Sequence, residues 1–207
     1  MSMRAVVLLD MPGESEWERD LAWRMAQTSP EDTARGVMFK GTLEAVRGLG
    51  DESAVRGCLE ASGEEHFVDA FRYPIRSLLR MLACAARQLA PRYGGGEAAL
   101  RELGRRTKAD YLSSPLGRVV KVLTHGSPRR MMESAPDIHR QTMSFGELSV
   151  EWTGLSSGRV VRRGDFLPAA CQEGVLEALL CATGGRRIWV KREWVDGLDG
   201  GFAFAWE

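Results

Sequence analysis

EAALRELGRRTKADYLSSPLGRVVKVL, residues 97–123, is the longest run in the chain with helical periodicity, and it lies close to the middle of the sequence. A helix turns by about 100° per residue, so the first half gathers its inward-facing side chains in one stripe: Leu100, Leu103, Thr107 and Tyr111. The second half forms another stripe, which on one straight helix would point about 140° away from the first: Leu112, Leu116, Val119, Val120 and Leu123. A straight helix would bury both stripes poorly, so this segment is expected to bend.

The bend is expected at Ser113-Ser114-Pro115. Proline lacks the N–H that an uninterrupted helix needs, whereas serine is a good N-cap and proline is favoured at the first helical position. The sequence therefore predicts a kink or a restart at Pro115. The cations of this segment resemble a nucleic-acid-binding face, but Glu97, Glu102 and Asp110 interleave with them, which favours a solvated helix surface.

The composition indicates a globular protein with no net charge. Apolar residues make up 44% of the 207 residues, which is enough for a genuine core. Lys and Arg total 28, as do Asp and Glu, so the net charge attracts neither nucleic acid nor an anionic membrane, and no nucleic-acid partner is expected. The first 14 residues do not have the pattern of a signal peptide, and no segment approaches the ~20 apolar residues that span a bilayer.

Four cysteines lie in apolar helical contexts without paired spacing: Cys58, Cys84, Cys171 and Cys181. This pattern favours reduced, buried thiols and a cytoplasmic location. Cys171 and Cys181 differ by about 80° around a helix, too far apart for one metal site. His66 and Asp69 have the spacing of a base and its orienting carboxylate, but a surface pair is favoured. The sequence therefore predicts no catalytic residue, metal ligand or cofactor.

Most of the chain up to residue 146 has helical patterns. Helices are expected over Glu16–Thr28, Thr33–Leu49, Asp51–Ser62 and Ile75–Leu89. Pro91 and the glycines at 94–96 are expected to form a loop, and Pro136 is expected to interrupt the helix that Ser127 caps. Residues 4–9, RAVVLL, fit either a short strand or the lead into the first helix.

From Glu147 onward the pattern changes from helical periodicity to alternation. Leu148, Val150 and Trp152 alternate with polar residues and predict a hairpin with the strand that contains Val160 and Arg162. A helix is expected over 168–183, followed by two more strands. The fold class is therefore α+β: one domain, 1–207, with a mostly helical part (1–146) and a small antiparallel sheet plus one helix formed by the C-terminal third (147–207).

Four segments together carry a family resemblance: RGVMFKGTLEAV (35–46), FRYPIRSLLRMLACAARQLAP (71–91), the segment 97–123 and LPAACQEGVLEALLCATGGRRIWVKREWVDGLDGGFAFAW (167–206). They look like a myxobacterial paralogous family of uncharacterised proteins of about this length. The ending is more distantly similar to vinyl-reductase-type small-molecule-binding domains, which are related in fold to haem-based nitric-oxide-binding domains and to trafficking-complex subunits that bind an acyl chain. This resemblance implies a helical body against an antiparallel sheet, often in a dimer.

The sequence departs from these relatives at the positions that would carry cofactor chemistry. The haem-type signature Tyr-x-Ser-x-Arg is matched by Tyr111 and Ser113, but Pro115 stands in place of the arginine. The cysteine cluster that some vinyl-reductase-type domains use for metal is missing. The resemblance therefore supports the architecture and predicts neither haem nor metal here.

The functional hypothesis rests on the aromatic-rich last third. A small apolar or acyl-like ligand is expected between the terminal sheet and the central helix, with six candidate binding residues: Tyr111, Arg118, Cys171, Val175, Trp189 and Phe204. Plain core packing of a small sheet is the competing interpretation. The prediction is a non-enzymatic, cytoplasmic ligand-binding or sensory module; the alternative is an interaction or scaffold protein that uses an exposed apolar face to form a homodimer or dock a protein partner.

Overall fold

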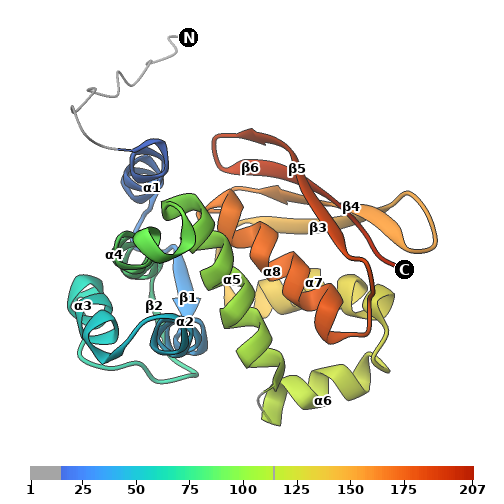
Figure 1. Cartoon of the computed structure of the whole chain (residues 1–207), viewed down its shortest axis with the longest axis horizontal. Coiled ribbons are helices and arrows are strands. Elements are labelled where there is room, and N and C mark those ends of the chain that lie inside the picture. The colour runs from blue at the N-terminus through green and yellow to red at the C-terminus, as the bar shows by residue number, and fades with distance from the viewer. Residues whose placement is uncertain (1–14, 114) are drawn as a thin grey trace.

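The central segment forms two helices that meet at a sharp bend. The computed structural model describes residues 15–113 and 115–207, with α5 at Gly96–Ser113 and α6 at Pro115–Leu123 (Figure 1). The predicted break is confirmed. A Cβ placed on Gly117 would lie 2.0 Å from the carbonyl oxygen of Tyr111, so α6 folds back closely against the end of α5.

Four helices precede the central segment: α1 (Glu16–Gln27), α2 (Gly36–Leu49), α3 (Glu52–Ser62) and α4 (Ile75–Tyr93). Their beginnings follow from local capping. Ser15 and Glu18 form a capping box, and the Asp51 carboxylate accepts a hydrogen bond of 2.9 Å from the backbone N–H of Ala54. The strand-or-helix question for residues 4–9 lies outside the described residues.

Three expectations for the helical part of the chain, residues 1–146, are wrong. Residues 33–35, expected to be helical, form β1 (Thr33–Arg35), which pairs antiparallel with β2 (Arg72–Pro74) and makes an isolated bridge to Met143. Tertiary pairing overrides the weak helical signal of three residues. The α4 helix also continues through Pro91, and α7 (Pro128–Thr142) continues through Pro136. A proline removes one N–H donor, and packing along the rest of each helix outweighs that loss.

The C-terminal third forms the predicted sheet and helix. The strands are β3 (Glu147–Trp152), β4 (Ser157–Arg163), β5 (Trp189–Asp196) and β6 (Asp199–Ala205), and α8 (Ala169–Ala182) connects the two hairpins. All neighbouring strands are antiparallel, in the order β3-β4-β6-β5. The α+β class, with a mostly helical body and a small antiparallel sheet from the C-terminal third, is confirmed.

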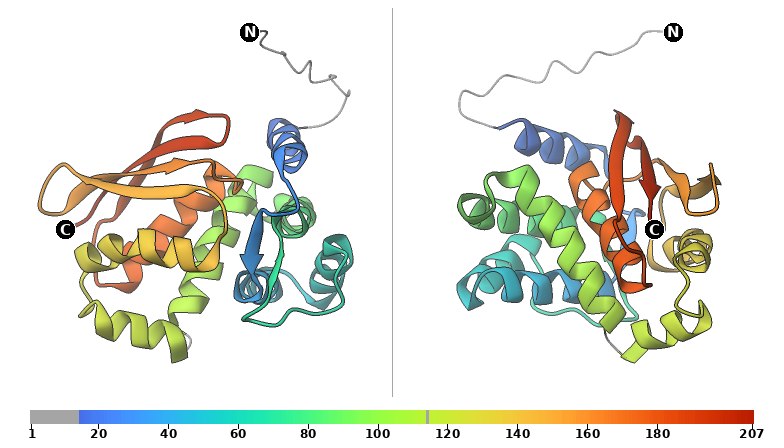
Figure 2. Two further views of the ribbon diagram at one scale, coloured as in Figure 1. Left: turned by 180° about the vertical axis from the view of Figure 1, so that it is seen from behind. Right: turned by 45° about the vertical axis from the view of Figure 1, so that its right-hand side comes forward.

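Helix α5 lies between the N-terminal helices and the layer formed by α8 and the sheet (Figures 1 and 2). It packs most extensively on α8. The two backbones approach very closely, because a Cβ on Gly104 would lie 2.1 Å from the carbonyl oxygen of Cys171, and one on Gly174 would lie 1.9 Å from that of Arg101. These glycines set the distance between the two helices.

Two hydrophobic clusters flank this helix pair. The first core gathers buried side chains mainly of α2, α3, α4 and the start of α5, around Phe39, Ile75 and Leu79. The second core joins the inner face of the sheet to α8, α7 and the end of α5: Leu112, Met131, Met132, Val160, Leu176, Leu179, Leu180, Val190, Phe202 and Phe204. Within residues 15–113 and 115–207, none of the helices combines the length and apolarity needed to cross a bilayer.

Candidate functional site

The second core has an aromatic floor on the sheet. The Phe204 ring stacks on Trp206 with centroids 6.0 Å apart and meets Trp152 edge-on at 5.6 Å. Arg129 places its guanidinium 4.1 Å from the Trp152 ring and closes the outer side of this group. These rings therefore form an apolar surface on the sheet, and the Arg129 guanidinium covers it at Trp152.

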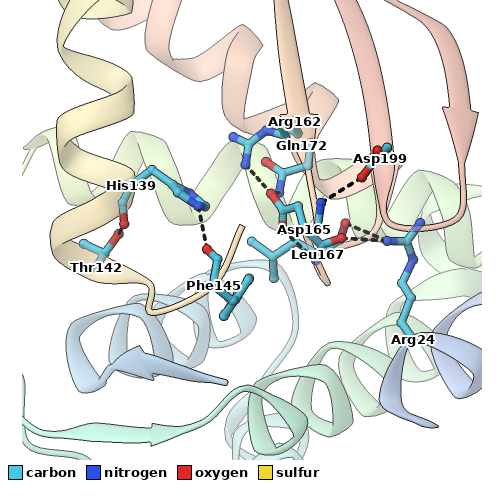
Figure 3. Close-up of polar contacts among 10 residues, drawn as sticks. Arg24, His139, Thr142, Phe145, Arg162, Asp165, Leu167, Gln172 and Asp199 are labelled. Atoms are coloured by element: carbon cyan, nitrogen blue, oxygen red, sulfur yellow. Dashed lines mark hydrogen bonds and ion pairs between the residues drawn. The ribbon is translucent and has the colours of Figure 1, made fainter. Parts of the chain in front are cut away.

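A buried ionic cluster borders the second core where β4 leads into α8 (Figure 3). Arg162 and Asp165 are 7% and 3% exposed and form an ion pair. The Asp165 carboxylate also accepts hydrogen bonds from the Gln172 side chain at 3.0 Å and from the backbone N–H of Leu167 at 2.9 Å. Asp165 is thus held by three donors, which fixes the turn between the strand and the helix.

Arg24 fastens α1 to this turn. Its guanidinium, 3% exposed, donates to the carbonyl oxygens of Asp165 at 3.1 Å, Leu167 at 3.4 Å and Gly197 at 3.3 Å (Figure 3). Its Nε donates to the Asp20 carboxylate at 2.8 Å, so the charge is balanced within its own helix. Arg24 therefore acts as a structural clamp between α1, the β4–α8 turn and the β5–β6 turn.

Lys108 on α5 is a third cation of this region, and it is partly buried. Its ammonium lies 5.2 Å from the ring centroid of Tyr111, whose side chain packs against the second core. Desolvation lowers the pKa of Lys108 to about 8, and the positive charge of Arg162 acts in the same direction. Burial also raises the pKa of the Tyr111 hydroxyl. A cation and a phenol therefore lie at the rim of an apolar layer.

His139 on α7 is the buried histidine of this region. Its Nε2 lies 3.0 Å from the carbonyl oxygen of Phe145, and because a carbonyl only accepts, Nε2 carries the proton (Figure 3). Burial, together with the charge of Arg162, lowers the pKa of His139, so the ring is neutral at pH 7. His139 therefore holds the α7–β3 connection rather than presenting a free nitrogen.

The buried thiols are protonated at neutral pH. Burial raises the pKa of Cys171 to about 12, and the Asp165 charge adds to the effect. Burial also raises the pKa of Cys58, which lies beside Cys84, a neighbour that the spacing of the cysteines did not reveal. Among the described residues, no group of three or more His, Cys, Asp or Glu side chains is placed to hold a metal ion.

The structure brings some of the six predicted binding residues together and separates others. Tyr111, Val175 and Phe204 all contact the second core. Cys171 is buried against the Gly104 backbone between α5 and α8.

The remaining two predicted residues are at the surface. Trp189 is 51% exposed at the start of β5. Arg118 is exposed on α6, where it lines an open depression of about 370 Å³ with Val119, Val122 and Leu123. These two residues are therefore not part of the second core.

Sequence reasoning missed Lys108 and the cluster of Arg24, Asp165 and Gln172. One signal was present: Arg162 occupies the same face of β4 as the buried Val160, two residues earlier. A charged side chain on the buried register of a strand needs a partner, which pointed to an acidic residue nearby. The contacts of Arg24 with the two turns join positions at least 141 residues apart, for which periodicity carries no signal.

Comparison with known proteins now assigns the chain to a family. A family model described as "Protein of unknown function (DUF2378)" matches residues 27–207. The chain belongs to this family. The resemblance to a family of uncharacterised proteins is thereby confirmed, while its myxobacterial distribution stays a prediction. No curated protein was found to match the sequence.

Solved structures similar to this DUF2378 member include H-NOX proteins. One from S. oneidensis, in the Fe(II)NO ligation state, has a TM-score of 0.66 at 11% identity and covers 84% of this chain and 99% of its own. An oxygen-binding H-NOX domain related to soluble guanylate cyclases has a TM-score of 0.65 at 13% identity, covering 84% and 95%. Unliganded Fe(II) H-NOX from K. algicida has a TM-score of 0.62 at 14% identity, covering 84% and 96%. The expected likeness to haem-type nitric-oxide-binding domains is confirmed at the level of the fold.

The histidines of this chain do not fit haem, the group named for a further similar structure with a TM-score of 0.64 at 13% identity. An axial histidine needs a ring nitrogen with a free lone pair. His66 and His125 are exposed, and the Nε2 of His139 is used by Phe145, which leaves only Nδ1, the nitrogen nearest its own backbone. The three histidines of the chain therefore offer no ready iron ligand.

Proposed function

We propose that this protein is a non-enzymatic, cytoplasmic ligand-binding or sensory module that holds a small apolar ligand between α5 and the terminal sheet. The observation that carries the proposal is the position of the second core, an apolar layer rimmed by Lys108 and Tyr111 in a fold similar to H-NOX domains. Of the six candidate residues, Tyr111, Val175 and Phe204 form the proposed wall, and Cys171 lies beside it. Arg118 and Trp189 remain in the proposal as rim residues.

A binding role without catalysis is supported by the state of the reactive groups. The raised pKa of Cys171 keeps its thiol protonated, and a neutral, hydrogen-bonded His139 is held as a structural group. Asp165 is engaged by three donors. These groups serve packing, and none is poised as a nucleophile or base.

Native mass spectrometry of the purified protein tests the proposal. A ligand held inside is expected to appear as a mass increment that disappears under denaturing conditions. Phe204→Leu should reduce that increment, whereas Phe39→Leu, in the first core, should preserve it. Bare protein in every preparation, together with no binding of added apolar carboxylic acids or alcohols, would contradict the proposal.

The second candidate function is self-association through α6. Val119, Val122 and Leu123 are 53%, 72% and 72% exposed, and exposed apolar side chains concentrated on one short helix are typical of an interface. A homodimer is the partner this candidate predicts. Light scattering coupled to size exclusion should then show a dimer that Val122→Glu converts to a monomer and Leu155→Glu, on the β3–β4 turn, leaves intact; a wild-type monomer at high concentration would rule it out.

A further inference from the structure

A short basic stretch stands out in a chain whose charges otherwise balance. Residues 111–132 contain four of the 28 Lys and Arg residues and none of the 28 Asp and Glu residues. The stretch covers the end of α5, all of α6 and the start of α7. It also carries the exposed apolar side chains of α6, which are Val119, Val122 and Leu123. Positive charge and exposed apolar surface are therefore combined on one segment.

The exposed apolar side chains form one stripe along α6. At about 100° per residue, Val119, Val122 and Leu123 together span an arc of about 100° around the helix. They are 53%, 72% and 72% exposed, so this apolar stripe faces solvent. Val120 lies outside the stripe, is partly buried and packs against the second core. The apolar stripe is therefore not the side that holds α6 on the protein.

Three cations of the basic stretch have no carboxylate partner. Within residues 15–113 and 115–207, neither Arg118, Lys121 nor Arg130 forms an ion pair. The fourth cation, Arg129, pairs with Glu133 at 3.2 Å. The three unpaired cations therefore give this end of the protein a positive charge that its own side chains do not neutralise.

The unpaired cations lie beside the apolar stripe. Arg118 lines the same open depression as Val122, and Lys121 lies farther around the helix on the same edge of the stripe. Arg130 follows in the first turn of α7, after the hydrogen-bonded turn at 124–127. Long cationic side chains keep their charge in a polar layer while their stems and neighbours contact an apolar one. This arrangement is typical of a helix that lies in the interface of a membrane.

The charge favours an anionic partner over a second copy of this chain. In a two-fold symmetric dimer through α6, the same patch of both subunits would meet, which would bring the unpaired cations together. Like charges across an interface repel one another. The helix lies on the outside of the molecule, at the end opposite the β5–β6 turn (Figures 1 and 2), so a flat surface can approach it. A layer of anionic lipid offers both the negative charge and an apolar interior.

We propose that α6 attaches this protein reversibly to an anionic lipid surface. The apolar stripe enters the boundary between the headgroups and the acyl chains, and the three unpaired cations bind the phosphates of the headgroups. A helix of nine residues with three exposed apolar side chains supports weak, reversible binding rather than a permanent anchor. This inference does not depend on a ligand in the second core, so either proposal stands or falls without the other.

Co-sedimentation with lipid vesicles tests the proposal. The wild-type protein is expected to bind vesicles of equimolar phosphatidylglycerol and phosphatidylcholine but not vesicles of phosphatidylcholine alone, and the binding should weaken as the salt concentration rises. Lys121→Gln should lower the partition coefficient for the mixed vesicles by about fivefold, the effect of one cation near an anionic surface. Lys121→Arg keeps the charge and should retain the wild-type value. Val122→Glu should abolish binding.

Two controls separate lipid binding from folding. Val122→Glu alters an exposed side chain, so its melting temperature should equal that of the wild type. Val195→Glu changes another exposed apolar residue, 42% exposed near the end of β5, and should bind the mixed vesicles as the wild type does. Equal binding to both kinds of vesicle, or to neither, would overturn the proposal. A wild-type dimer that binds no vesicles would overturn it too and would assign the apolar stripe to a second copy of the chain.

Discussion

The two cores of this protein are built differently. In the first core the aromatic rings of Phe39, Phe67 and Tyr73 pack against one another, with centroids 4.5 to 5.5 Å apart, among aliphatic side chains. The second core is bordered by Lys108 and by the buried ion pair of Arg162 and Asp165. Buried charges are costly and contribute little net stability, so the buried ion pair beside the second core distinguishes it from the first core, whose clustered side chains are apolar.

The largest expected effect is the loss of an aromatic anchor in either core. Phe39 and Phe204 are 0% and 1% exposed, so Phe39→Ala and Phe204→Ala should each reduce the free energy of unfolding by about 3–5 kcal/mol. Urea denaturation followed by circular dichroism measures this. Both losses should appear in one cooperative transition, as the predicted single domain over residues 1–207 requires; two separate wild-type transitions would show that the cores unfold independently.

Breaking the buried ion pair should cost nearly as much. Asp165→Asn leaves the Arg162 guanidinium without its counter-ion and is expected to destabilise the protein by about 3 kcal/mol or somewhat more. The matched control is Asp137→Asn, which removes an exposed partner of Arg140 on α7 and should change the stability by less than about 1 kcal/mol. Equal effects of the two substitutions on the urea midpoint would show that the buried ion pair contributes no more to stability than the exposed one.

The contact between the layers is expected to be sensitive to a single methyl group. Gly104→Ala would place a Cβ 2.1 Å from the carbonyl oxygen of Cys171, which forces α5 and α8 apart and should cost about 1–3 kcal/mol. Gly41→Ala is the control, because its Cβ meets only the Thr107 methyl at 3.4 Å and alanine is the better helix former. Thermal unfolding should show a lower midpoint for the first variant and an equal or higher one for the second. A Gly104→Ala protein as stable as the wild type would contradict this packing.

The smallest expected effect is a pH dependence from His139. Its pKa is lower in the folded protein than in the unfolded chain, so the unfolded chain binds the extra proton first as the pH falls. The neutral His139 ring contributes fully to the free energy of unfolding above about pH 6.5, and this contribution is lost as the pH falls below that value. Urea midpoints between pH 7.5 and 5.5 should decline less for His139→Gln than for the wild type. His125→Gln, at an exposed position, should keep the wild-type decline.

Local patterns predicted most of the fold. The bend at Pro115, the helices expected over Glu16–Thr28 and Asp51–Ser62 and the alternation of the terminal strands depend on neighbouring residues, which a sequence displays directly. The β1–β2 pair was missed because three-residue strands carry little periodicity and pair across about 40 positions. Continuation of helices through Pro91 and Pro136 was missed because tertiary packing outweighs one lost hydrogen bond.

The candidate site was predicted less completely, for a physical reason. Tyr111, Val175 and Phe204 follow from apolar periodicity, which does place them at the second core. The sequence does not show which partners the charged side chains of Lys108, Arg162 and Asp165 contact. Those contacts depend on how α5, β4 and α8 pack against one another. Arg162 alone left a signal, as a charged residue on the buried register of its strand.

The central claim is that the second core binds the ligand and the first core only supports the fold. Amide and methyl NMR spectra recorded during titration with decanoate test it most directly. The account predicts shifts concentrated at Tyr111, Val175 and Phe204, with Phe39 and Leu79 unaffected. Shifts concentrated at Phe39 and Leu79, or an unchanged spectrum at saturating decanoate, would contradict it.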